Sequence, residues 1–213
     1  MSEEYLDDNK VILQGEVDTE PEFSHILNGE EFFQFNLKTK RLSEVEDIIP
    51  ISISSKLKDA YNIKIGDKIA IKGQFRSYNK MEEGKSRLLL RVFCKNIMNF
   101  DLEQNSNQIE LNGYICKKPI YRITPFSREI CDVLLAVNRN FGKSDYIPCI
   151  AWGRNAQLVN SLPVGSKISL IGRIQSREYT KKIENTDESV KKVAYEVSAS
   201  NVCVLENEKT QEI

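Results

Sequence analysis

Residues Asp145 to Tyr179 read DYIPCIAWGRNAQLVNSLPVGSKISLIGRIQSREY, and this stretch decides the fold. Alternating apolar and polar residues predict a strand from about Asp145 to Trp152 and a longer strand from about Lys167 to Tyr179. Between them, Asn155 to Leu162 can form a short helix, which Pro163 and Gly165 end. One face of each strand is apolar and suits a core, whereas the other face carries aromatic residues and arginines.

The same pattern is written twice in the chain, at a constant offset of 98 residues. Identical residues that meet at this offset include Asn9/Asn107, Leu13/Leu111, Gly15/Gly113, Pro21/Pro119, Arg41/Arg139, Asp47/Asp145 and Pro50/Pro148. After one inserted residue, GDKIAIKGQFRS at 66–77 meets GSKISLIGRIQS at 165–176. Self-similarity of this length and order indicates two copies of one domain.

Each copy has five alternating strands, with one short helix between the third and the fourth strand. That order predicts an all-β fold with short helices, built as two tandem OB-fold five-stranded barrels. We expect the first barrel at 9–100, a polar linker at 101–106 and the second barrel at 107–205. Residues 1–8 and 206–213 read as acidic, frayed ends, and 80–87 and 180–192 read as polar loops between the last two strands.

Internal glycines occur inside the predicted strands, where a small barrel needs sharp bends. They are Gly15, Gly73, Gly113 and Gly172.

Positive charge is concentrated in the second copy, although the net charge of the chain is only −1. Residues 107–182 contain 12 Lys or Arg and 5 Asp or Glu, whereas residues 1–106 contain 15 and 19. A basic excess alone is often only a solvated face. Interleaved with aromatic residues on one strand face, it favours a single-stranded nucleic acid, since cations meet the phosphates and rings meet the bases.

The candidate binding residues follow from that face. The stacking candidates are Trp152, Tyr146 and Tyr179, with Tyr78 in the first copy. The phosphate candidates are Arg139, Lys143, Arg154, Arg173 and Arg177, with Arg122 and Arg128 beside the first turn and Arg41 and Arg76 in the first copy. A lone tryptophan is often a core residue, so a core role for Trp152 is the alternative.

Several function classes are not indicated. The five cysteines are widely spaced without a C-x-x-C pair and read as small core residues in a reducing compartment. His25 has no Cys or His partner nearby and reads as a loop residue beside a turn. No Gly-rich phosphate loop, Cys/His pair or metal-ligand cluster occurs, so we expect no enzyme activity, no cofactor and no metal. No apolar run approaches ~18 residues and no secretory signal is present, so we expect a cytoplasmic, nucleoid-associated protein.

Four motifs of the second copy resemble the bacterial single-stranded DNA-binding protein family. They are N-x-I-x-L-x-G-Y-I at 107–115, K-P-x-Y-R-x-T-P at 118–125, L-A-V-N-R at 135–139 and V-G-S-K-I-S-L-I-G-R-I-Q-S-R-E-Y at 164–179. The first copy resembles the family more distantly. The resemblance implies a barrel that wraps single-stranded DNA over its outer sheet face and stacks bases on Tyr146, Trp152 and Tyr179.

The chain also departs from the family pattern. Members usually carry one such domain and a Gly/Gln-rich tail with an acidic, partner-recruiting tip, which 204–213 (VLENEKTQEI) lacks. The first copy has Ile48 and Ser54 where the second has Tyr146 and Trp152, so we expect its face to be poorer in rings. Because relatives usually present four barrels, two chains of two barrels would reach that number, and we expect a homodimer.

Three functions remain open from the sequence. The first is a protein that coats and protects single-stranded DNA in replication, recombination or repair. The second is an OB-fold interaction protein, in which the first barrel docks a replication-restart or primosome factor and DNA binding is secondary. The third is an RNA-binding OB protein.

Overall fold

The computed structural model describes residues 8–41, 43–82, 84–101, 106–139, 142–182 and 189–205. Its first half contains β1 (Asn9–Val17), β2 (Glu22–Leu27), β3 (Glu30–Lys40), β4 (Glu46–Ser54), α1 (Ser55–Tyr61), β5 (Lys68–Glu82) and β6 (Lys85–Met98). Its second half contains β7 (Asn107–Ile115), β8 (Ile120–Ile123), β9 (Glu129–Asn138), β10 (Ser144–Trp152), α2 (Arg154–Ser161), β11 (Lys167–Lys182) and β12 (Ser189–Val204).

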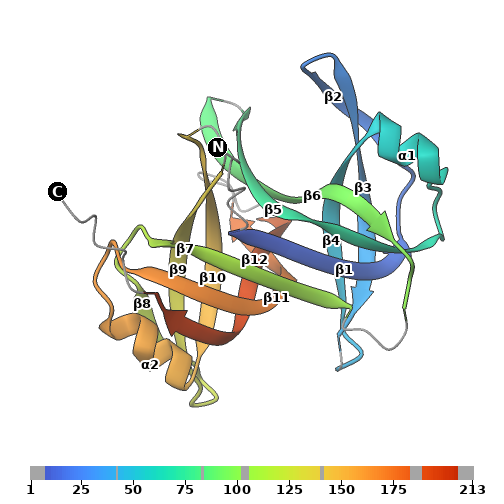
Figure 1. Cartoon of the computed structure of the whole chain (residues 1–213). Coiled ribbons are helices and arrows are strands. Elements are labelled where there is room, and N and C mark those ends of the chain that lie inside the picture. The colour runs from blue at the N-terminus through green and yellow to red at the C-terminus, as the bar shows by residue number, and fades with distance from the viewer. Residues whose placement is uncertain are drawn as a thin grey trace.

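All twelve strands belong to one sheet, in the order β2-β3-β4-β6-β5-β1-β7-β11-β12-β10-β9-β8. The second half of this order repeats the first half in reverse, so β1 and β7 run side by side at the centre (Figure 1). Val11 lies opposite Ile109, and these two residues hold matching positions in the repeat. The halves are therefore related by an approximate two-fold axis at this pair, as in an isologous dimer interface.

Each half curls into a barrel. In the first barrel (β1–β6), β1 also pairs with β3, and β4 runs parallel to β6. The second barrel (β7–β12) repeats both pairings through β7–β9 and β10–β12. Bulges at Gly73 and Gly172 bend β5 and β11, and a Cβ there would lie 2.3 Å from the Phe93 carbonyl oxygen and 2.2 Å from that of Ser198. These two positions therefore accept only glycine.

Two strands were not predicted. β2 and β8 each pair with the following strand and form the two ends of the sheet. A two-residue turn joins β2 to β3, with Asn28 and Gly29 at φ of 50° and 78°, as a primed hairpin turn requires. The prediction of a loop at His25 was wrong, because this hairpin places the residue within β2.

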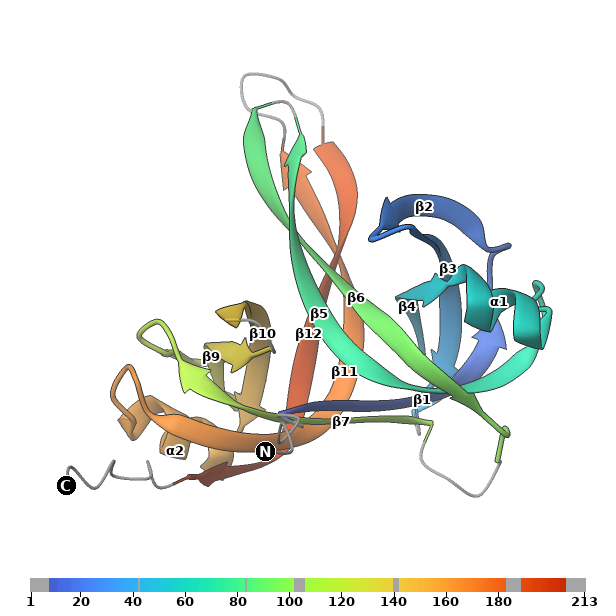
Figure 2. The same cartoon turned by 45° about the horizontal axis from the view of Figure 1, so that its top comes forward.

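The strands on either side of the predicted polar loops are longer than expected. β5 and β6 stay paired up to Glu82 and Lys85, and β11 and β12 stay paired up to Lys182 and Ser189. Both hairpins project well beyond their barrels, and Figure 2 shows them rising side by side. Much of the ranges 80–87 and 180–192 is therefore strand, because cross-strand pairing continues through polar residues.

Two asparagines at the start of β1 and β7 extend the sheet with their side chains. Asn9 Nδ2 donates to the Phe75 carbonyl oxygen (2.7 Å), and the Phe75 N–H donates to Asn9 Oδ1 (2.9 Å). Asn107 makes the same pair of bonds to Ile174, at 2.7 and 2.9 Å. The side-chain amide of each asparagine therefore bonds to the backbone of β5 or β11 as a peptide group would, at the point where that strand has curved away from β1 or β7.

The interior is one continuous cluster of aliphatic side chains that passes through both barrels. Cys94, Cys131 and Cys149 belong to this core, as predicted, and burial raises the pKa of the Cys94 thiol to about 12. The prediction was wrong for Cys203, which is exposed, and for Cys116, which is only partly buried and lies outside this cluster. The predicted tails fall almost entirely outside the described residues, and so does 102–105 of the linker. Among the helices described here, none is long and apolar enough to cross a membrane.

Candidate nucleic-acid interface

The outer face of the second barrel carries three aromatic rings predicted to stack on bases. Tyr146 on β10 is 46% exposed, and Tyr179 on β11 is 38% exposed. Trp152 at the end of β10 is partly buried, and its indole N–H donates to Ser198 Oγ on β12 at 3.0 Å. Since this bond fixes the edge of the ring, Trp152 is held at the surface in one orientation and does not belong to the core cluster.

Trp152 borders an open pocket of about 570 Å³. The pocket runs from the Trp152 ring to the turn between β8 and β9, and its lining residues are Ile123, Ser127, Arg128, Glu129, Trp152 and Gly153. Arg128 therefore borders the same pocket as the tryptophan. A ring beside a guanidinium in an open pocket can accept a base together with its phosphate.

Exposed cations surround the rings. Arg173 on β11 lies opposite Ser198, so it shares the sheet face of Trp152, and Arg177 projects from the same strand face. Lys143 precedes β10, and Arg154 begins α2. Within the described part of the chain, the side chains of these four residues form no ion pair. Their charges are therefore available to an anionic ligand.

Arg122 is also on this face but has a partner. Its Nε donates to Asp132 Oδ2 at 2.9 Å, and this hydrogen bond raises the pKa of the guanidinium. Both side chains are well exposed, so solvent weakens the pair and a phosphate could compete for the arginine.

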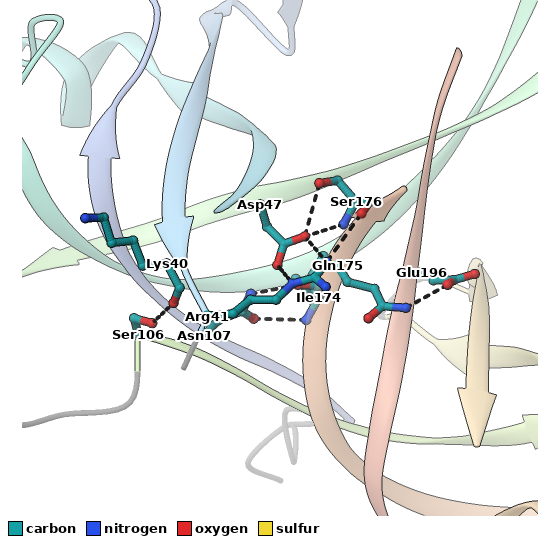
Figure 3. Close-up of polar contacts among 9 residues, drawn as sticks. All are labelled: Lys40, Arg41, Asp47, Ser106, Asn107, Ile174, Gln175, Ser176 and Glu196. Atoms are coloured by element: carbon teal, nitrogen blue, oxygen red, sulfur yellow. Dashed lines mark hydrogen bonds and ion pairs between the residues drawn. The ribbon is translucent and has the colours of Figure 1, made fainter. Parts of the chain in front are cut away.

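Two predicted phosphate residues instead join the barrels. Figure 3 shows Arg41 of the first barrel bound to Asp47 through Nε–Oδ2 and Nη2–Oδ1 contacts, both 2.6 Å long. The same carboxylate accepts the backbone N–H of Ser176 on β11 at 2.7 Å. Burial disfavours the charge, but the bonds from Arg41 and Ser176 outweigh this and lower the pKa of Asp47.

The approximate two-fold axis repeats this arrangement. Arg139 forms an ion pair with the buried Asp145, which accepts the backbone N–H of Ser77 on β5 at 2.5 Å. Arg139 Nη2 also donates to the Ser77 carbonyl oxygen at 2.9 Å. Both arginines thus hold a buried carboxylate against the other barrel, and their first role is structural.

Arg76 and Tyr78 follow one face of β5. The Arg76 guanidinium lies 3.7 Å from the ring centroid of Phe93, and burial lowers its pKa. The Tyr78 ring lies 5.5 Å from the guanidinium carbon of Arg139, at the junction with the second barrel. These two candidates are therefore close to each other but apart from Trp152.

The expectation that the first barrel is poor in rings was incomplete. Phe93 on β6 takes the place of Ser198, and it packs on Phe32 at 5.8 Å between centroids. His25 also stacks on Phe32, with 5.2 Å between the ring centroids and 13° between the ring planes. The first barrel thus has no ring at Ser54, the position that matches Trp152, but it has the Phe93 ring on the neighbouring strand. Aligning 88–97 with 193–202 places Phe93 opposite Ser198 and could have found it.

Known proteins resemble this chain in sequence and in fold. The model of the Single-strand binding protein family matches residues 106–205. Single-stranded DNA-binding protein 3 of Streptococcus agalactiae is 34% identical over 113 residues, which are 50% of this chain and 78% of the relative. The chain belongs to the single-strand binding protein family.

Other similarities define how far the family resemblance extends. Single-stranded DNA-binding protein 1 of Staphylococcus aureus is 39% identical over 80 residues, so this chain covers 48% of it. The wild-type single-stranded DNA binding protein from Thermus aquaticus has a crystal structure that superposes with a TM-score of 0.72 at 20% identity. It covers 96% of this chain, so the likeness in fold includes both OB barrels.

Proposed function

We propose that this family member binds and protects single-stranded DNA, largely without sequence specificity, in replication, recombination and repair. Bases would stack on Trp152, Tyr146 and Tyr179, and phosphates would meet Arg173 and Arg177. The remaining contacts would come from Lys143, Arg154, Arg128 and Arg122.

One observation carries this proposal: three exposed or partly exposed rings share a sheet face with arginines that form no ion pair within the described residues. Every base has a π-face, so stacking favours no particular sequence. A duplex keeps its bases paired and stacked inside and offers only its phosphates, so it should bind more weakly.

A competition experiment tests the proposal. A fluorescent oligo-dT is bound to the full chain and displaced by unlabelled oligo-dT, oligo-rU or duplex, with anisotropy as the readout. We expect oligo-dT to compete best and duplex least. Equal competition by duplex would contradict stacking, and better competition by oligo-rU would make RNA the ligand.

We propose that the chain acts by binding and not by catalysis. Its family relatives are named for DNA binding, and the described residues contain no group of three or more His, Cys, Asp or Glu side chains suited to a metal ion. Its place of work would be the nucleoid in the cytoplasm, where single strands are exposed during replication.

We also propose that 9–100 and 107–205 are two OB-fold domains and that two chains associate into a homodimer with four barrels. Light scattering on the full chain checks the dimer: a mass of twice 24.5 kDa is expected, and a monomer at micromolar concentration would contradict it.

A further inference from the structure

The approximate two-fold axis gives the molecule two junctions between its barrels. At the first junction, β5 of the first barrel contacts β10 of the second, and Ser77 accepts the Tyr146 N–H with its Oγ at 2.9 Å. At the second junction, β11 contacts β4, and Ser176 bonds to Asp47. Each junction has the same kind of buried arginine–aspartate ion pair, so the backbone is arranged in the same way at both.

The other side chains at the two junctions differ. At the first junction, the Tyr78 ring lies 5.5 Å from the guanidinium carbon of Arg139, and the backbone N–H of Tyr146 bonds to Ser77. The matching positions at the second junction hold Arg177 and Ile48, beside Arg41. Both junctions have cations, but these two matched positions carry aromatic rings only at the first junction.

A series of rings and guanidinium groups leads from the first barrel into the first junction. The Phe93 ring lies under Arg76 at 3.7 Å, and Tyr78 follows Arg76 on the same strand face. The Tyr78 ring is 5.5 Å from the Arg139 guanidinium, which is paired with Asp145, the neighbour of Tyr146.

The equivalent route through the second junction is interrupted. Ser198 stands in place of Phe93, and Gln175 stands in place of Arg76. The amide of Gln175 is bound to Glu196 at 2.7 Å, so this position adds a carboxylate where the first junction has a cation. A phosphate would be disfavoured at that carboxylate.

We infer that a bound single strand crosses between the barrels at the first junction only, with Tyr78 as a stacking residue and Arg76 beside it as a phosphate contact. The inference rests on the proposed function and extends it, because it joins the face of the first barrel and the face of the second into one continuous track. Short strands occupy the second barrel alone, and longer strands continue across Tyr78.

The test compares oligo-dT of about 10 and about 30 nucleotides, since one OB fold covers about 4–16 nucleotides. Affinity is measured by anisotropy on the full chain, with Trp152 fluorescence recorded in parallel to report occupancy of the second barrel. Tyr78→Ala should weaken binding of the long strand about tenfold, within the range for one lost stacking contact, and leave the short strand unaffected. Tyr78→Phe keeps the ring and should bind both strands as the wild type does.

Ile48→Ala is the matched control, because Ile48 occupies the position of Tyr146 at the second junction. It should bind both lengths normally. Equal affinity of Tyr78→Ala and wild type for the long strand, or an equal loss in Ile48→Ala, would overturn the inference. Failure of the wild type to bind the short strand while it binds the long one would also overturn the inference, whereas failure to bind either strand would overturn the proposed function and this inference with it.

Discussion

At the scale of single residues, Trp152 is the side chain on which the stacking account depends most. Its indole N–H is held by Ser198, and its ring faces an open pocket that Arg128 also lines. Trp152→Ala should weaken oligo-dT binding by roughly 5- to 150-fold, since one stacked base is worth about 1–3 kcal/mol. Anisotropy of a labelled oligonucleotide measures the change.

The matched variant for Trp152 keeps an aromatic ring. Trp152→Phe should retain most of the affinity, because stacking needs a ring and not the indole N–H. If both variants bound as weakly as each other, the contribution of Trp152 would come from its bond to Ser198 and not from stacking.

Asp47 is the residue whose ionisation holds the barrels together at the second junction. Its pKa is lowered in the folded chain, so the stability that it provides is present above about pH 4 and is lost as the pH falls through the folded value. Asp47→Asn should lower the free energy of unfolding by about 1.5–3 kcal/mol at pH 7, as expected for hydrogen bonds to a charged group. The difference from wild type should shrink below pH 4.

Urea unfolding followed by circular dichroism at pH 7 and at pH 3 gives both values. Asp132→Asn serves as the control, because its pair with Arg122 is exposed and should be worth less than about 1 kcal/mol. A loss for Asp47→Asn that is as large at pH 3 as at pH 7 would mean that its charge is not the cause.

At the scale of strands, the start of β1 is held to β5 by the side chain of Asn9, which makes the hydrogen bonds of a peptide group. Asn9→Ala removes both bonds to the Phe75 backbone and leaves two buried polar groups without that partner. We expect a loss of about 2–4 kcal/mol of unfolding free energy, at about 1–3 kcal/mol for each group with partial relaxation. Urea unfolding measures this loss, and a change of less than about 1 kcal/mol for Asn9→Ala would contradict the assignment.

Period-two alternation was sufficient to place most strands and the exposed faces of Tyr146 and Trp152. The helix stop signals Pro163 and Gly165 predicted α2 to within a residue, because the helix cannot continue past them. Period-two alternation missed β2, although Asn28-Gly29 is a strong hairpin signal, because the strand before that turn has exposed residues on both faces.

The roles of Arg41 and Arg139 could not be predicted from either copy alone. The pattern within one barrel says which side chains face outward, but it does not say what the other barrel places against them. A clue was present in the repeat itself: Arg41 and Asp47 recur at the same spacing as Arg139 and Asp145. Opposite charges retained in both copies indicate a pair, but only the bonds of Asp47 with Ser176 and of Asp145 with Ser77 show that each pair reaches across to the other barrel.

At the scale of the whole molecule, the continuous sheet and the two ion-paired junctions make the barrels one cooperative unit. Unfolding in urea should therefore give the same midpoint by Trp152 fluorescence, which reports the second barrel, and by far-UV circular dichroism, which reports both. Two separate transitions would show that the barrels unfold independently and that the junctions contribute little to stability.

The binding of an unpaired strand to rings and cations on one face is tested most directly by titrating Trp152 fluorescence with oligo-dT at increasing salt. We expect strong quenching at low salt. The logarithm of the affinity should fall linearly with the logarithm of the salt concentration, with a slope of about 0.7 per phosphate contacted. Absence of quenching, or an affinity that does not change with salt, would contradict binding of the strand at this face.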